Sequence, residues 1–341
     1  MNTRNQKTVS RRRVLLIGVA LIVFFFASFA FGRYAVPVTD VIKILLKNCF
    51  GLPFKADWDA NMEIAVMNVR LPRIVLACLV GCSLSGAGCA YQSVFRNPMA
   101  APDILGASSG ACFGAALAIL LGRSSVGITI SAFCFSILSL LLVYLIGSRV
   151  RGSRATSLLL AGIMIGSLFS AGTSYIKLVA DPGNQLPAIT YWLMGSLSGA
   201  KMRDLLFAAV PMGVGLLVLF ILRWRVNLLT LHPDEARAMG TNTERLRFFV
   251  VSAATLLTAA SVASSGMIGW VGLVIPNLCR KLIGNDNRYL LPASMLFGAL
   301  FLLLVDDISR NLLAVEIPIG ILTAFVGAPF FLYLMTRKEK A

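Results

Sequence analysis

The chain has 341 residues, of which 57% are hydrophobic and 13% are charged, and its formal net charge is +16. The mean hydropathy is +0.82. A soluble protein could not keep so much apolar surface away from water, so the composition predicts an all-α membrane protein with many spans. Lysine and arginine in the loops of such a protein set its topology and explain the positive charge. No basic run has interleaved aromatic residues that would stack on bases, which argues against nucleic-acid binding.

Nine apolar runs predict helices that cross the membrane. They cover residues 14–35, 74–95, 104–122, 126–147, 157–178, 205–222, 248–265, 290–305 and 317–335. The first run is too long for a cleaved signal peptide, so we count it as a span. Both termini carry clusters of lysine and arginine and are expected in the cytoplasm. Two cytoplasmic termini require an even number of spans, so we expect ten.

Two shorter apolar runs compete for the tenth span, at 186–199 and 267–279. If the first run crossed, the loop 223–247 with its arginines would face outward, against the positive-inside rule. We therefore predict that residues 267–279 cross. The run 186–199 is expected to form a half-span or an outer interfacial helix, for which Tyr191 and Trp192 are suitable.

The chain offers few groups for catalysis or metal binding. Its seven cysteines form no CxxC pair and are interpreted as packing residues. His232 is the single histidine, so we expect no histidine metal centre and no enzyme activity. None of the nine runs has an ionisable residue well inside the membrane, which disfavours a proton-coupled carrier. The chain lacks GxxxxGK[ST], so energy for transport would come from a partner.

Glycines recur at helical spacing in two runs. The third run contains Gly106, Gly110 and Gly114, and the fifth contains Gly162 and Gly166. Small residues at this spacing let helix backbones approach closely in lipid. The pattern is consistent with packing inside one subunit and with a seam between two subunits.

Two loops on the expected cytoplasmic side have distinctive sequences. "RNPMAAPD" (96–103) is a tight non-helical path set by two prolines, either a simple turn or a constriction in a pathway. In "HPDEARAMGTNTERLRFF" (232–249), the pattern predicts a helix at 234–239 that ends at Gly240. Thr241 or Asn242 could cap a second short helix. This loop is either a connector or a docking surface for a cytoplasmic partner.

Three arginines, Arg70, Arg73 and Arg310, fall on the expected outer side, where the positive-inside rule disfavours them. They could reach lipid phosphate or pair with nearby carboxylates. Those carboxylates are Asp306, Asp307 and Glu316. They could instead form a basic pocket for acidic residues of a docking protein, because the guanidinium fork binds carboxylates bidentately.

Eight motifs appear in order along the chain: "RLPR", "RNPMAAPDILGASSGA", "LLLAGIMIG", "YWLMGSLSG", "EARAMG", "GMIGWVGLVIPNLCR", "LLPASMLFGA" and "EIPIGILTAFVGAPFFLYLM". Over about residues 14–337, the chain resembles the permease family of ATP-binding-cassette (ABC) importers for iron–siderophore complexes, haem and cobalamin. The family usually has Pro-His in the eighth span, where this chain has Pro276-Asn277. This departure weakens an assignment of the substrate more than an assignment of the class.

The resemblance implies a type II importer permease fold, with residues 1–341 forming one transmembrane domain and the loop at about 223–247 coupling to an ATPase. It also implies a second permease subunit, identical or a close paralogue, two cytoplasmic ATPases and an outer substrate-binding protein. No cofactor is expected on this chain, since ATP is used by the partner. The residues carried over from the family are Asp234, Glu235, Ala236 and Gly240 for ATPase coupling, Asn97, Met99 and Thr156 for the cytoplasmic gate, and Arg70, Arg73 and Arg310 for binding-protein docking.

The function expected from the resemblance is import of an iron chelate, a siderophore complex above all, across the bacterial plasma membrane. Haem and cobalamin are alternatives within the family. A secondary carrier is the alternative from another class, since sodium coupling through backbone carbonyls needs no buried charge.

Overall fold

The computed structural model describes residues 3–32, 34–52, 57–147, 149, 154–231 and 233–336, and these residues form helices and loops without a strand. The helices are α1 (Thr3–Ser28), α2 (Val38–Phe50), α3 (Ala60–Ile64), the π-helical turn η1 (Ala65–Arg70), α4 (Leu71–Phe95), the 3₁₀ turn η2 (Pro102–Leu105), α5 (Ala107–Leu120), α6 (Ser125–Gly147), α7 (Arg154–Val179), α8 (Gln185–Leu193), α9 (Met202–Leu229), α10 (Pro233–Ala238), α11 (Thr243–Ser265), α12 (Val271–Ile283), α13 (Asn287–Asn311) and α14 (Ile319–Thr336).

Each of the nine apolar runs corresponds to a helix, namely α1, α4, α5, α6, α7, α9, α11, α13 and α14. In the described part of the chain, six helical segments are long and apolar enough to cross a membrane, while α5 and α14 are shorter apolar helices. The prediction of an all-α protein with many spans is therefore confirmed.

The tenth predicted span is built differently from the others. Helix α12 has 13 residues, a length of about 20 Å at 1.5 Å per residue, whereas the hydrocarbon core is about 30 Å thick. It follows a non-helical stretch at 266–270, in which Trp270 has a φ of 70°. The run 267–279 is thus an extended segment followed by a short helix. The competing run 186–199 contains the short helix α8, as expected for a segment that does not cross.

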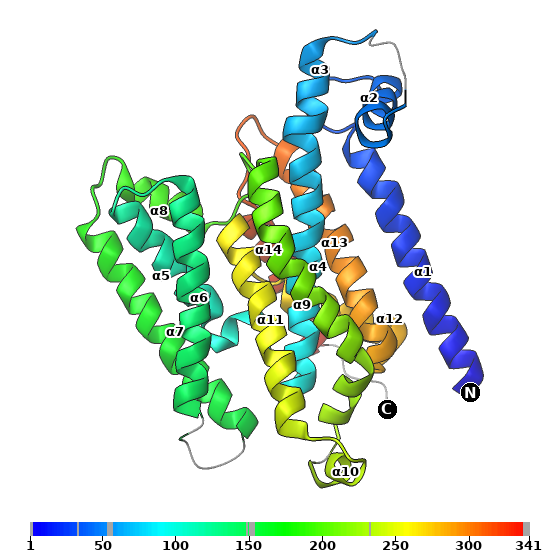
Figure 1. Ribbon diagram of the computed structural model, residues 1–341, viewed down its shortest axis with the longest axis vertical. Helices are drawn as coiled ribbons and strands as arrows, with labels where there is room; N and C mark the ends of the chain where they lie inside the picture. Colours follow the sequence, from blue (N-terminus) through cyan, green and yellow to red (C-terminus); the bar gives the residue numbers. More distant parts are fainter. Residues whose placement is uncertain are drawn as a thin grey trace.

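Figure 1 shows α4 at the centre of one group of helices, beside α9, α11 and α13. Helices α5, α6 and α7 form a second group, with α8 at its upper end. Helices α2 and α3 lie at one end of the molecule, and α10 lies at the opposite end with the start of α1. We call these the α2 end and the α10 end.

The central helices touch backbone to backbone. A Cβ atom added to Gly81 of α4 would lie 2.2 Å from the carbonyl oxygen of Gly298 in α13, and one added to Gly88 would lie 1.8 Å from that of Gly272 in α12. Real Cβ atoms do not approach carbonyl oxygens so closely, so these contacts require glycine. Lipid gives little hydrophobic drive for helix association, and such close packing supplies the attraction.

The glycine repeat predicted from sequence packs inside the chain. A Cβ on Gly110 would lie 2.6 Å from the carbonyl oxygen of Phe135 in α6, and one on Gly114 would lie 2.5 Å from that of Ser131. On α7, a Cβ on Gly162 would lie 2.4 Å from the carbonyl oxygen of Ile104. These glycines therefore pack α5 against α6, and α7 against η2, within one subunit.

Helix α2 was not predicted. Its buried residues Val41, Ile44 and Leu45 have the spacing of one helix face, while Val38 and Ile42 are exposed. A run of 13 residues that carries Asp40, Lys43 and Lys47 is too short and too charged for a span. It forms instead a half-buried helix at the α2 end (Figure 1).

Candidate functional site

The outer arginines belong to a network of ion pairs at the α2 end. Arg73 Nε donates to Asp306 Oδ1 at 2.9 Å, and Arg73 NH1 lies 2.9 Å from Glu316 Oε2. Arg310 Nε lies 3.2 Å from Asp306 Oδ2. The Asp306 side chain is 0% exposed and is shared by the two guanidinium groups. The network therefore joins α4 to α13 and to the loop before α14.

The same network reaches α1. Arg310 NH2 donates to Ser28 Oγ at 2.9 Å and also contacts Asp307. Ser28 Oγ in turn donates to Asp307 Oδ1 at 2.6 Å. Arg70 donates to the carbonyl oxygens of Phe29 and Tyr34, so it holds the turn between α1 and α2. We call Arg70, Arg73, Arg310, Asp306, Asp307 and Glu316 the arginine cluster.

The arginine cluster contains three cationic and three anionic side chains, so its formal charges balance. All three arginines are buried. Buried charges need partners: Arg73 and Arg310 contact carboxylates, and Arg70 donates to two carbonyl oxygens. The structure thus brings the three predicted docking residues together and gives each of them partners within the chain. Their role in docking stays a prediction.

The predicted gate loop lies against α12. Asn97 Oδ1 accepts from the N–H of Met99 at 2.9 Å, which closes the turn around Pro98. Asn277 Nδ2 donates to the carbonyl oxygen of Pro98 at 2.9 Å. Arg280 NH1 donates to Asn277 Oδ1 at 2.9 Å and orients the amide. From the sequence, Asn277 stood out only as a departure from the family. In the structure, its side chain binds the backbone of this loop at Pro98.

The gate residues are only partly brought together. Asn97 and Pro98 line a cavity of about 340 Å³, whose other polar walls include Ser93 and Asn287. Met99 beside them is exposed. Thr156 is exposed in the first turn of α7, and in the part of the chain that the structure describes no hydrogen bond links it to the loop. A gate formed by Asn97, Met99 and Thr156 therefore remains a prediction.

The predicted coupling helix is α10, and it ends as expected. Gly240 has a φ of 73°, in the left-handed region. The N–H of Thr241 donates to the carbonyl oxygen of Ala236 at 3.3 Å, a bond typical of a helix that ends at glycine. Ala236 is fully buried, while Glu235 and Gly240 are exposed. The side chain of Asp234 and the whole of His232 lie outside the described residues.

The second short helix predicted after Gly240 does not exist as a separate element. Asn242 Oδ1 accepts from the N–H of Arg245 at 3.0 Å and caps α11, which continues without interruption to Ser265. The prediction of the cap is confirmed, but the prediction of two helices is wrong. Nothing in residues 243–248 stops the helix, because no glycine or proline lies there.

Three non-helical or helix-terminal segments, which are far apart in the sequence, meet in space between the helices. Ser196 N donates to the carbonyl oxygen of Ser265 at 2.8 Å, and Ile319 N donates to that of Gly195 at 2.9 Å. A Cβ on Gly266 would lie 2.3 Å from the carbonyl oxygen of Trp192. We call this meeting point of residues 192–196, 265–270 and 319–320 the central junction. Non-helical backbone at membrane depth is stable only inside protein or beside a water-filled cavity.

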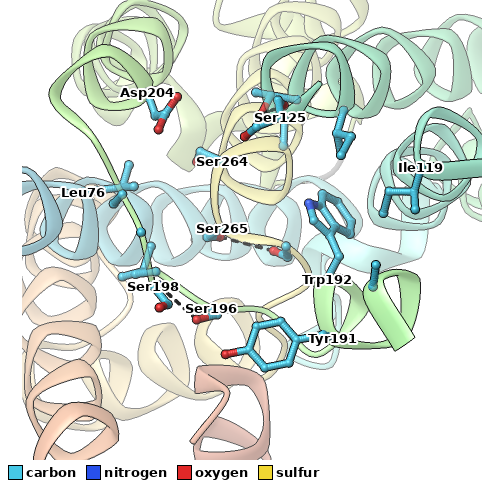
Figure 2. Close-up of a pocket in the computed structure, with 18 of the residues that line it drawn as sticks. Leu76, Ile119, Ser125, Tyr191, Trp192, Ser196, Ser198, Asp204, Ser264 and Ser265 are labelled. Atoms are coloured by element: carbon cyan, nitrogen blue, oxygen red, sulfur yellow. Dashed lines mark hydrogen bonds between the residues drawn. The ribbon is translucent and has the colours of Figure 1, made fainter. Parts of the chain in front are cut away.

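Two cavities flank the central junction. Figure 2 shows the first, of about 450 Å³, which is lined by Tyr191 and Trp192 of α8 and by Ser264 and Ser265 of α11. The second has a volume of about 630 Å³ and is lined mainly by apolar side chains. Its walls include Met194, Met267, Trp270 and Phe325.

One carboxylate lies deeper than the sequence suggested. Asp103 belongs to η2, and the neighbouring Pro102 is next to Gly272 and Leu84: a Cβ on Gly272 would lie 2.5 Å from Pro102 Cγ and 2.7 Å from the Leu84 carbonyl oxygen. Leu84 is eleven residues from the end of α4, or about 16 Å along the helix. Asp103 lies outside the nine apolar runs, but the loop after α4 folds back between the helices and brings this carboxylate near the middle of α4.

Among the residues that the structure describes, no group of three histidine, cysteine or acidic side chains could hold a metal ion. The described cysteines, Cys78, Cys82, Cys89, Cys112, Cys134 and Cys279, are free thiols. The described surfaces that could take part in function are thus the arginine cluster, the gate loop, α10 and the walls of the two cavities.

Comparison with known proteins identifies the class. The model of the FecCD transport family matches residues 9–337. The chain is 39% identical to the molybdate import system permease MolB of Haemophilus influenzae, over 96% of each chain. It is 41% identical to an iron chelatin transport system permease of Helicobacter pylori, over 82% of this chain and 84% of that one.

A solved structure of an inward-facing metal-chelate type ABC transporter matches 95% of this chain and 99% of its own, with a TM-score of 0.85 and 38% identity. A permease of this class carries no ATPase of its own, so the chain is not an enzyme. The chain therefore belongs to the FecCD transport family and is a multi-pass membrane permease subunit of an ABC importer.

Proposed function

We propose that an iron chelate, specifically a ferric siderophore, is the substrate that this permease admits to the cytoplasm. The observation that carries the proposal is the likeness of nearly the whole chain to the metal-chelate type transporter, at 38% identity and a TM-score of 0.85. The relative from Helicobacter pylori named for iron chelatin supports the same substrate class. Haem and cobalamin remain alternatives of similar bulk.

Molybdate is the second candidate, because the relative from Haemophilus influenzae matches 96% of the chain at 39% identity. Molybdate is a small dianion, whereas a ferric siderophore is bulky. The two cavities of about 450 and 630 Å³ beside the central junction are more suitable for the larger cargo. This difference in size and charge makes the two candidates easy to separate by experiment.

The proposed assembly contains two permease subunits, identical or paralogous, and two ATPases that bind at the α10 end. Large apolar side chains on α7 and α14, such as Leu168 and Phe325, are exposed in the single subunit and are available to lipid or to a second copy. The proposed location is the bacterial plasma membrane, with the α10 end and both termini in the cytoplasm. The arginines at the start of α1 agree with that orientation. Residues 1–341 would act as one domain.

The proposed coupling surface is α10, with Asp234, Glu235, Ala236 and Gly240 in contact with the ATPase. Ala236 is buried and fixes α10 to the rest of the permease, while Gly240 at its end is exposed and accessible to the ATPase. ATP would bind and react only on the partner. No cofactor of the permease itself is proposed.

Docking of the binding protein is proposed at the α2 end, through the arginine cluster. Glu316 is the most accessible carboxylate of the cluster, with 25% of its side chain exposed. A carboxylate of the binding protein could therefore replace Glu316 on Arg73. On this view Glu316→Gln strengthens docking and Arg310→Glu weakens it, while a lipid-anchoring role predicts no effect of either change.

The substrate assignment can be tested in cells that lack the gene for this permease. Uptake of labelled ferric siderophores, haem, cobalamin and molybdate is measured with and without the restored gene. The proposal expects restored uptake of at least one ferric siderophore and no effect on molybdate. Restoration of molybdate uptake alone would assign the chain to the oxyanion class.

A further inference from the structure

Asp103 is a carboxylate that the transport mechanism described so far does not use. Its depth can be read from two helices. A Cβ on Gly162 of α7 would lie 2.4 Å from the carbonyl oxygen of Ile104, the residue after Asp103. Gly162 is eight residues from the start of α7, or about 12 Å along its axis. The contact with α4 lies about 16 Å from the end of that helix. Both distances therefore place η2 well inside the membrane.

The Asp103 side chain is exposed in the single subunit and accepts a hydrogen bond from the hydroxyl of Ser108. No arginine, lysine or histidine in the described part of the chain forms a salt bridge with it. A carboxylate that faces hydrocarbon is so costly that ionisable residues in membranes face a water-filled space or a partner subunit. Asp103 therefore marks a surface of α5 and η2 that does not face lipid.

Buried groups of α5 connect Asp103 to the apolar cavity. Ser108 and Cys112 are four residues apart on α5 and lie on one face of the helix. Cys112 Sγ lies 4.0 Å from Met267 Sδ, and Met267 is one of the walls of the 630 Å³ cavity. Ser108 and Cys112 are both buried, so hydroxyl, thiol and thioether groups lie between Asp103 and this cavity.

We propose that Asp103 is a charge filter in the translocation path, which slows anionic cargo and favours neutral or cationic metal chelates. The proposal rests on the proposed function, since it narrows the substrate from any iron chelate to one without net negative charge. The groups between Asp103 and the cavity are uncharged, and so are the named walls of the cavity, so a negative charge at this depth acts without a compensating cation. In a dimer the two copies would add their charges around one path.

The test uses the complete importer in vesicles, with permease, ATPase and binding protein, and a neutral ferric trihydroxamate and an anionic ferric tris-catecholate as probes. Asp103→Asn should raise the ratio of anionic to neutral uptake at least about fivefold. This is the change in rate that corresponds to the repulsion between two unit charges about 4 Å apart in bulk water. Asp103→Glu should keep the wild-type ratio. The matched control is Asp57→Asn, which removes a carboxylate of an exposed loop near the α2 end. An unchanged ratio in Asp103→Asn would overturn the filter.

A second measurement is independent of cargo and of the binding protein. Ser109→Cys introduces a thiol on α5 next to Ser108, the hydrogen-bond partner of Asp103. Its labelling by cationic and anionic thiosulfonates is compared with and without Asp103→Asn, with the parent chain as the blank. The filter predicts that Asp103→Asn speeds anionic labelling and slows cationic labelling. Equal rates for both reagents would refute it. If the wild type imports no ferric chelate, the proposed function fails, and this labelling still decides on the filter.

Discussion

Replacing Asp306 by asparagine should destabilise the α2 end of the permease more than the removal of any exposed charged side chain does. The change keeps the size of the side chain but leaves Arg73 and Arg310 without their shared, fully buried carboxylate. Breaking a buried ion pair costs about 3–5 kcal/mol. Arg73 keeps Glu316 at 2.9 Å and Arg310 keeps Asp307, so we expect the lower value, about 3 kcal/mol.

The loss can be measured as the free energy of unfolding in mixed micelles, followed by tryptophan fluorescence in a denaturant titration. The matched control is Asp40→Asn, because Asp40 lies 3.8 Å from Lys43 in a pair that is partly exposed. Exposed pairs of this kind contribute about 0–1 kcal/mol. Equal losses for Asp306→Asn and Asp40→Asn would refute the view that the cluster holds α1, α4 and α13 together.

Three further predictions concern coupling, gating and packing. Gly240→Val forces a β-branched residue to a φ of 73°, and it should abolish ATP-driven uptake or co-purification of the ATPase while insertion is normal; unchanged uptake and co-purification would contradict a coupling role. Cysteines at Asn97 and Thr156 should be labelled by cytoplasmic thiol reagents in one state of the ATPase cycle and shielded in another, and state-independent labelling would argue against a gate. Gly88→Ala, whose Cβ would lie 1.8 Å from the Gly272 carbonyl oxygen, should cost about 1–3 kcal/mol of unfolding free energy, unlike Gly213→Ala, where nothing lies within 4 Å.

The helices were predictable because a long apolar run in a membrane chain has few alternatives to a helix. The end of α10 was also predictable, since a glycine after a short helix is a local signal that needs no distant partner. Helix α2 was missed because its amphipathic pattern falls below the length and hydropathy of a span. Local patterns therefore account for most of the fold.

The sites were harder to predict, because they depend on contacts between distant parts of the chain. The central junction forms through backbone hydrogen bonds among the segments that contain Gly195, Ser265 and Ile319. None of these residues, taken alone, predicts that a helix is interrupted there. Asp103 looked like the edge of a span, and only the contact between Pro102 and Gly272 places it deep among the helices. The arginines were identified, but the sequence left open whether lipid, internal carboxylates or a docking protein would be their partners.

The central claim is that this subunit passes an iron chelate when a partner hydrolyses ATP. It is tested most directly in vesicles that contain the complete importer and ATP in the lumen, to which labelled ferric siderophores or labelled molybdate are added outside with the binding protein. The account predicts that iron accumulates inside, and that accumulation stops when ATP is replaced by an analogue that cannot be hydrolysed. Accumulation of molybdate without iron, or iron uptake that does not depend on ATP, would contradict it.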